Sequence, residues 1–208
     1  MKIKSLASAP DRIYRYRVVF EDDSVMRLYR QTIQDFGLFA GKELTDEEMQ
    51  SLQTAAGEMS AKMRAVRIVS ASSVSKRDLE QRLIQKGENP DQAKAAVAWM
   101  SEMSLVDDRK TAEQVVARCI TKGYGLARAK QALFEKRIPK ELWEEALADY
   151  PEQIDKIMDY LESHLGENST DKDVRKVIDA LIRRGHSYGN IRKAMQEMAM
   201  DSQDFPEG

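Results

Sequence analysis

Apolar and polar residues follow two different spacings along this chain, and the change between them separates a short amino-terminal part from a long helical part. Two β-prone runs, residues 13–20 and 25–29, flank the turn-forming residues 21–24, which predicts a β-hairpin. A short helical stretch then ends at Gly37. From about Glu47 onward the apolar positions recur at helical spacing, and we include the β-branched stretch 66–69. The pattern predicts a mainly α-helical protein with a small amino-terminal β-hairpin region.

Capping residues predict where the first long helices begin and end. Thr45 and Glu48 form a capping box, in which each side chain bonds the backbone amide of the other residue, so a helix over 47–69 is predicted. Ser75 predicts the start of a helix over 75–86, which Gly87 ends. Pro90 is typical of a first helical position and predicts a third helix over 90–103.

This three-helix unit recurs, and each copy is marked by an anchor residue that ends its second helix. A leucine lies four positions before each anchor and a cation directly before it; the anchors are Gly87, Arg137 and Gly185. Their separation of about 50 residues is typical of stacked supersecondary units. We predict three tandem three-helix repeats in an elongated curved array. The predicted parts are a hairpin region over 1–44, repeats over 45–104, 105–150 and 151–200, and a flexible acidic tail over 201–208.

Composition limits the kinds of partner. The net charge is −2 and the pI is near 5.9, so no overall basic field draws this chain onto nucleic acid, and such contact would need a local patch. Cys119 lies in an apolar helical stretch, which favours a buried thiol over a reactive one. Charges throughout residues 1–20 interrupt any run of signal-peptide or membrane-span length. We expect a monomeric cytoplasmic protein that does not bind membranes.

The residues that carry enzyme chemistry are sparse. The two histidines, His164 and His186, do not stand in metal-ligand spacing with Cys119 or with each other. The Gly-x-Gly at 123–125 lacks the Gly-Lys-Ser/Thr of a phosphate-binding loop. We therefore expect no catalytic residue, no metal site and no cofactor.

Four stretches in order carry a resemblance to a known family. A serine-led helix begins at Ser75, and Leu105-Val106-Asp107-Asp108 forms a later turn. Lys122-Gly123-Tyr124-Gly125 precedes several basic residues, and Arg183-Arg184-Gly185-His186-Ser187-Tyr188 is followed by Ile191-Arg192. In this order the stretches resemble the RecX family, regulators of the bacterial RecA recombinase, over essentially the whole chain. The turn resembles the family's Leu-Leu-Asp-Asp turn, the third stretch its second unit, and the last its final Arg-Arg-Gly-aromatic-Ser-Tyr motif.

The chain departs from the family pattern at several positions. Val74 stands where an arginine often precedes the serine, Thr111 and Val115 replace aromatic residues, and His186 replaces Phe or Tyr. Arg137 replaces a glycine, and we expect this change to alter the end of that helix.

The resemblance implies a protein that lies along the groove of the RecA–DNA filament. It implies modulation, with inhibition expected, of filament extension, ATPase, strand exchange and co-protease activity, in recombinational repair and the SOS response. It requires no catalysis by this chain. Weak binding of free single- or double-stranded DNA is a further expectation, which the sequence leaves open.

Cations at related positions of the repeats are the candidate contacts. Guanidinium groups suit both RecA carboxylates and DNA phosphates, so the sequence leaves these two open. Cations also favour helix carboxyl termini for purely structural reasons. The candidates are Arg82, Lys86, Arg128, Lys130, Lys136, Arg137, Arg183, Arg184, Arg192 and Lys193.

Other interpretations remain open at this point. Tyr124 and Tyr188 either stack on a base or pack across a repeat boundary, and we favour packing. The aromatic–basic alternation over 14–17 fits either a nucleic-acid face or a two-faced hairpin, and we favour the hairpin. The alternative function is a helical-repeat adaptor that binds protein helices without a link to DNA repair. A helix-turn-helix repressor would need a recognition helix richer in Arg, Asn and Gln.

Overall fold

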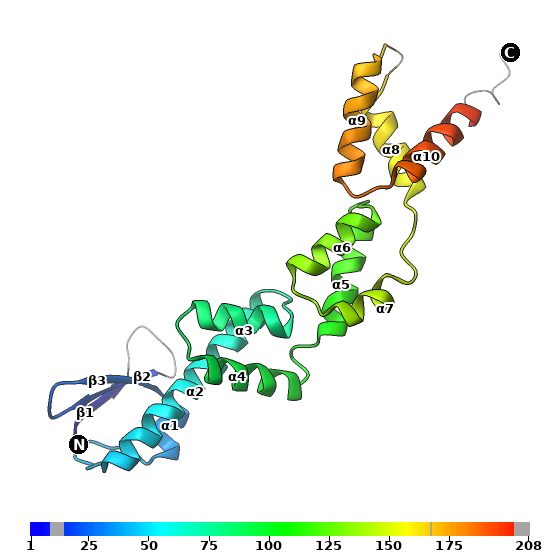
Figure 1. Cartoon of the computed structure of the whole chain (residues 1–208). Coiled ribbons are helices and arrows are strands. Elements are labelled where there is room, and N and C mark those ends of the chain that lie inside the picture. Colours follow the sequence, from blue (N-terminus) through cyan, green and yellow to red (C-terminus); the bar gives the residue numbers. More distant parts are fainter. Residues whose placement is uncertain (9–14, 167, 202–208) are drawn as a thin grey trace. The chain divides into compact units, whose positions relative to one another are not determined.

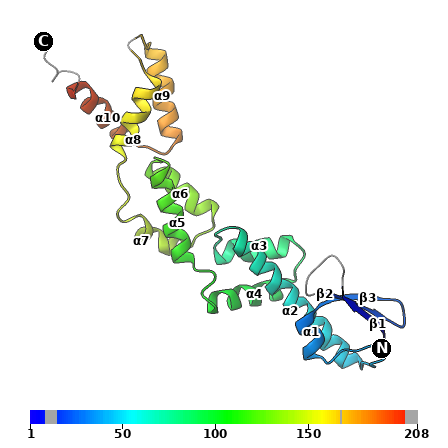
Figure 2. The same cartoon turned by 180° about the vertical axis from the view of Figure 1, so that it is seen from behind.

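The computed structural model describes residues 1–8, 15–166 and 168–201, and the chain divides into two compact units, Met1–Val106 and Asp107–Gly208 (Figures 1 and 2). The fold is mainly helical with a small amino-terminal sheet, as the sequence predicts. The finer division into five parts stays a prediction. The expectations for residues 13–14 and for the tail beyond 201 lie outside the described residues.

The first unit begins with a three-stranded antiparallel sheet in the order β1-β2-β3. Its strands are β1 (Ile3–Ser8), β2 (Arg15–Phe20) and β3 (Val25–Tyr29). The predicted hairpin is confirmed, since β2 and β3 pair with Tyr16 opposite Leu28. Strand β1 was not predicted: only its first residue, Ile3, is buried, so the strand carries almost no apolar alternation.

Two helices cover this sheet, the short α1 (Arg30–Asp35) and the amino-terminal part of α2 (Asp46–Ala71) (Figure 1). The α2 capping box is confirmed: Thr45 Oγ1 accepts from the Glu48 amide at 3.1 Å, and the Glu48 carboxylate accepts from the Thr45 amide at 2.8 Å. The stretch 66–69 is helical, as predicted. Because α2 is 26 residues long, it contributes Leu52 to the core under the sheet and Ala61 to a second core.

That second core lies between α2, α3 (Lys76–Gln85) and α4 (Pro90–Glu102). Leu79 and Leu83 of α3 pack against Val97 and Met100 of α4, and all four side chains are buried. Together α2, α3 and α4 form the first three-helix group.

The second unit contains two further three-helix groups, each with its own core. The first consists of α5 (Asp108–Thr121), α6 (Leu126–Glu135) and α7 (Trp143–Leu147), and the second of α8 (Ile154–His164), α9 (Asp171–Arg183) and α10 (Tyr188–Asp201). A 3-10 turn over Lys140–Leu142 precedes α7. Among the described helices, none is long and apolar enough to cross a membrane.

The second helix of every group ends in the same hydrogen-bonded turn. The anchors Gly87, Arg137 and Gly185 have φ values of +88°, +54° and +90°. In each turn the residue after the anchor donates its amide to the carbonyl of the leucine four positions before the anchor, with N···O distances of 3.0–3.1 Å. The anchor amide donates to the carbonyl three residues before it. This is the Schellman arrangement, which satisfies carbonyls that a helix end leaves open. The turn also buries Leu83, Leu133 and Leu181 completely.

The expectation that Arg137 alters its helix end is wrong. Ile138 bonds Leu133 and Arg137 bonds Phe134, at 3.0 and 2.9 Å, just as the glycine-anchored turns do. The left-handed backbone is therefore kept, although a residue with a Cβ atom pays about 1–2 kcal/mol for it.

Replacing Arg137 by glycine is expected to stabilise the protein by about 1 kcal/mol, because the turn is kept while the left-handed strain is relieved. In thermal unfolding this corresponds to a rise in Tm of about 2–4 °C. Arg137→Ala removes the same charge but keeps the strain, so it should give no rise. Equal Tm changes in the two variants would show that charge, not backbone conformation, governs this position.

Candidate cationic binding surfaces

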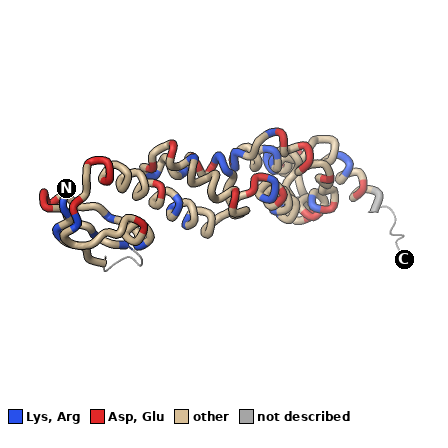
Figure 3. Tube along the Cα trace, turned by 90° about the horizontal axis from the view of Figure 1, so that it is seen from below, with Lys and Arg blue, Asp and Glu red and all other residues tan. Residues whose placement is uncertain are grey.

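Lysines and arginines are interspersed with aspartates and glutamates along both units (Figure 3). Two of the ten candidate cations, Arg82 and Lys86, belong to the first unit and eight to the second. The structure sorts them by what their side chains already contact within the chain.

In the first unit, Arg82 and Lys86 line a cleft of about 460 Å³ together with Arg64 and Arg67 of α2. The remaining lining residues are Ile68, Ala71 and Ser72. Four cations thus converge on one cleft, two from α2 and two from α3 and its carboxyl-terminal cap, and only Arg82 and Lys86 were predicted from the sequence. Arg64 and Arg67 stand three positions apart on a helix, which places them on one face, but they do not recur in the other repeats.

Arg64 and Arg82 are fixed by contacts with other groups of the protein. Arg64 Nε lies 2.7 Å from Glu88 Oε1, and its Nη1 donates to the Lys86 carbonyl at 2.6 Å. Arg82 Nη2 lies 2.9 Å from Asp78 Oδ2. Both carboxylates are buried, so these contacts restrict the guanidinium groups from the protein side.

Arg67 and Lys86 complete the cleft in different ways. Arg67 Nη2 donates to the Tyr29 hydroxyl at 3.0 Å, and its Nε donates to the Met63 carbonyl at 3.3 Å. Lys86 is exposed, and within the described part of the chain its ammonium group takes part in no ion pair.

In the second unit, the candidate cations of α6 differ in their surroundings. Arg128 forms a 2.9 Å ion pair with Glu135, and this hydrogen bond raises the pKa of Arg128 and lowers that of Glu135. Lys136 and Arg137 lie at the end of the helix. Lys130 is exposed, and its side chain has no ion pair among the described residues.

The candidates of α9 and α10 divide in the same way. Lys193 pairs with Glu152 at 2.9 Å, a hydrogen bond that raises the pKa of the lysine. Arg183 and Arg192 are exposed, and across residues 1–8, 15–166 and 168–201 neither forms an ion pair. Lys130, Arg183 and Arg192 are therefore the candidate cations of this unit whose charge is most available to a partner.

Arg184 is engaged inside the chain. Its Nη2 donates to the Lys122 carbonyl at 2.9 Å, and its guanidinium carbon lies 5.2 Å from the ring centres of both Tyr124 and Tyr160. Such cation–π contacts hold the residue between two helical groups. The packing predicted for Tyr124 is thus confirmed, whereas the packing predicted for Tyr188 is wrong, since that side chain is 65% exposed.

The two groups of the second unit are joined there through main-chain atoms. The Gly125 amide donates to the Arg184 carbonyl at 3.0 Å, and the Ala127 amide donates to the Gly185 carbonyl at 3.2 Å. A Cβ atom on Gly125 would lie 2.0 Å from the Gly185 oxygen, so only glycine permits this approach. The motifs 122–125 and 183–188, far apart in sequence, are the two sides of one junction.

Two side chains around the junction, the buried His186 and the half-buried Tyr150, bond to backbone carbonyls. His186 is 5% exposed, and its Nε2 lies 3.0 Å from the Gly123 carbonyl, which can only accept, so Nε2 carries the proton. Its Nδ1 is buried with no hydrogen-bond partner. Burial lowers the pKa of His186, and the charge of Arg184 adds to this. The Tyr150 hydroxyl donates to the Tyr124 carbonyl at 2.6 Å, and burial raises the pKa of Tyr150 to about 12.

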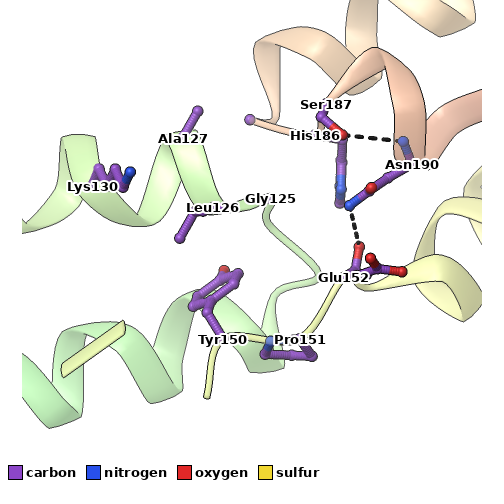
Figure 4. A pocket seen from close by; sticks show the side chains of 11 residues that line it. Gly125, Leu126, Ala127, Lys130, Tyr150, Pro151, Glu152, His186, Ser187 and Asn190 are labelled. Carbon is purple, nitrogen blue, oxygen red and sulfur yellow. Dashed lines mark hydrogen bonds between the residues drawn. The ribbon is translucent and has the colours of Figure 1, made fainter. Parts of the chain in front are cut away.

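A cavity of about 460 Å³ opens beside the junction (Figure 4). Asn190 lines this cavity: its backbone amide donates to Ser187 Oγ at 3.1 Å, and its side-chain Nδ2 donates to the Glu152 carbonyl at 3.2 Å. The predicted burial of Cys119 is confirmed, and burial raises the pKa of its thiol. Among the described residues, no group of three His, Cys, Asp or Glu side chains is placed to hold a metal ion.

These features define a helical repeat protein with exposed cations on its later helices and a cationic cleft in its first unit. Residues 107–147 match the family model for the second three-helix domain of RecX. The regulatory protein RecX of Xanthomonas axonopodis pv. citri is 30% identical over 63% of this chain and 83% of its own length, and that of Streptococcus gordonii is 25% identical over 89% and 74%. The chain belongs to the RecX family of regulatory proteins, which confirms the resemblance seen in its motifs.

Solved structures agree on the fold. A crystal structure of a regulatory protein RecX matches with a TM-score of 0.66 at 18% identity, covering 94% of this chain and 98% of that one. RecX from Lactobacillus salivarius gives 0.62 at 22% identity, over 70% and 99%.

Replacing Gly125 by alanine is expected to destabilise the protein by at least about 2 kcal/mol. The added Cβ atom would overlap the Gly185 carbonyl and force apart the two backbone segments that meet at the junction. Urea unfolding measures the loss. Gly166→Ala is the matched control, since nothing lies within 4 Å of its Cβ position, and it should change stability by no more than about 0.5 kcal/mol. Equal effects at the two glycines would contradict the close approach.

The buried His186 predicts a pH dependence of stability. Its folded-state pKa is lowered, so as pH falls below about 6.5 the unfolded chain binds the proton first and the free energy of unfolding decreases. We expect a fall between about pH 7.5 and 5.5, with a slope of up to about 1.4 kcal/mol per pH unit. Urea unfolding across this range should show a shallower slope for His186→Phe. Parallel curves for the two proteins would show that His186 is not the group responsible.

Proposed function

We propose that this chain binds the RecA recombinase and its DNA filament and inhibits filament extension, ATPase, strand exchange and co-protease activity. In this proposal it acts as a cytoplasmic monomer in recombinational repair and the SOS response. It contributes binding energy and performs no reaction of its own. Family membership supports a regulatory role, and the link to RecA comes from the resemblance of its motifs to regulators of that recombinase.

The observation that carries the proposal is the exposure of Lys130, Arg183 and Arg192. All three lie in the second unit on α6, α9 and α10, and no carboxylate of the described chain neutralises them. Exposed, unpaired cations steer a protein toward an acidic surface and contribute to affinity in a salt-dependent way. RecA carboxylates and DNA phosphates both fit this chemistry.

The overall charge limits how the chain engages free DNA. With a net charge of −2, it has no general field that would hold it on a polyanion. We therefore propose that DNA alone is bound weakly and that the filament, which offers protein and phosphate contacts together, is the preferred partner.

The test is the single-stranded-DNA-dependent ATPase of RecA, titrated with this protein at two salt concentrations. We expect inhibition that weakens as salt rises. For the triple variant Lys130→Glu, Arg183→Glu and Arg192→Glu, the concentration that gives the same inhibition should rise at least about tenfold. Each charge reversal replaces an attraction by a repulsion.

A second triple variant controls for net charge. Lys110→Glu, Arg118→Glu and Arg175→Glu change the same number of exposed cations in the same unit, and Arg118, like Arg183, lies in the last turn of its helix. This variant should inhibit nearly as well as the original chain. An equal loss of inhibition in both triple variants would show that net charge alone causes the effect. If the original chain gave no inhibition at any ratio to RecA, the adaptor function would be favoured.

A further inference from the structure

All the charged residues that line the cleft between α2 and α3 are positive. Its cations are Arg64, Arg67, Arg82 and Lys86, and no carboxylate contributes to its lining. Four positive charges face two negative ones, because Glu88 and Asp78 are the ion-pair partners of these side chains within the described part of the chain, and both carboxylates are buried beneath them. The cleft therefore keeps a positive excess.

The arginines are positioned before any ligand arrives. The contacts to Glu88 and the Lys86 carbonyl use Nε and Nη1 of Arg64, and those to Tyr29 and Met63 use Nη2 and Nε of Arg67. Each guanidinium thus has a terminal nitrogen outside these contacts. Because the side chains are already ordered, binding an anion costs less conformational entropy than at a mobile lysine or arginine.

Three guanidinium groups and one ammonium group offer more donors than a single carboxylate can accept with its two oxygens. Adjoining phosphates of one nucleic-acid strand supply acceptors from successive nucleotides, and the planar arginine fork suits each of them. The cleft volume of about 460 Å³ is in the range of small ligand sites, about 300–1,000 Å³.

The rest of the lining indicates how the strand would be held. Ile68 and Ala71 offer an apolar strip for sugar or base surface, and Ser72 adds one hydroxyl. The lining contains no aromatic ring for stacking and no side-chain amide for a base edge. We propose that this cleft binds successive phosphates of single-stranded nucleic acid without reading its sequence.

Lys86 tests the proposal with least risk to the fold, since its ammonium group is exposed and its structural contact is made by its carbonyl. Fluorescence anisotropy with a labelled oligothymidine, without RecA, should show at least a fivefold rise in Kd for Lys86→Glu and a smaller rise for Lys86→Gln. Losing one phosphate contact should also reduce the slope of log K against log salt by about 0.7.

Lys94→Glu is the matched control, because Lys94 is exposed on the neighbouring α4 and changes the net charge equally. It should alter Kd less than twofold. An equal rise for Lys94→Glu, or no rise for Lys86→Glu, would overturn the proposal.

Four unlabelled competitors decide which class of anion the cleft binds. Unlabelled oligothymidine should displace the probe, and a mixed-sequence oligonucleotide should do so equally. Displacement at lower concentration by ATP would make the cleft a nucleotide site, and displacement by polyglutamate at equal charge would make it a site for acidic protein; either result would overturn the strand assignment. Because RecA is absent, failure here leaves the ATPase experiment unaffected.

Discussion

The ends of α9 and α6 satisfy each other's backbone, and the second unit depends on this exchange. The first amides of a helix and the last carbonyls of another have no partners within their own helices. Here the amides of Gly125 and Ala127 bond the carbonyls of Arg184 and Gly185, which explains why α6 begins without a side-chain cap. The two helix ends thus satisfy each other at one junction, and the absence of a side chain at Gly125 allows the two backbone segments to approach.

This junction changes how the basic motifs should be understood. Arg183 and Arg184 are neighbours in sequence, yet Arg184 is held between two tyrosine rings and bonded to backbone, while Arg183 is exposed. The doublet at the end of α9 therefore combines one structural cation, Arg184, with one that is available for binding, Arg183. Because basic doublets recur in the sequence, each looks like a single binding contact. In this doublet, however, the two arginines have different physical roles.

Most of the helical fold could be predicted because its signals are local. The capping box at Thr45 and the leucine-to-anchor spacing depend on residues within one turn of each other, so they are visible in sequence. The junction could not be predicted, since it uses main-chain atoms that every residue carries. Strand β1 shows no alternation, and the convergence of Arg64 and Arg67 with α3 depends on tertiary packing. The exposure of Tyr188 likewise follows from where α10 begins, not from residue type.

The two sets of cations differ in how they can contribute to binding. Arg64 and Arg82 are fixed by buried carboxylates, so they offer defined geometry and lose little freedom when an anion arrives. Lys130 and Arg192 are exposed and unpaired in the described chain, so they act mainly through charge, which salt screens. Cations fixed by buried carboxylates favour a ligand of regular geometry, and exposed cations without such contacts tolerate an uneven acidic surface. Under the two proposals, the fixed cations of the first unit would hold a strand of phosphates, and the exposed cations of the second unit would meet an acidic surface of either protein or DNA.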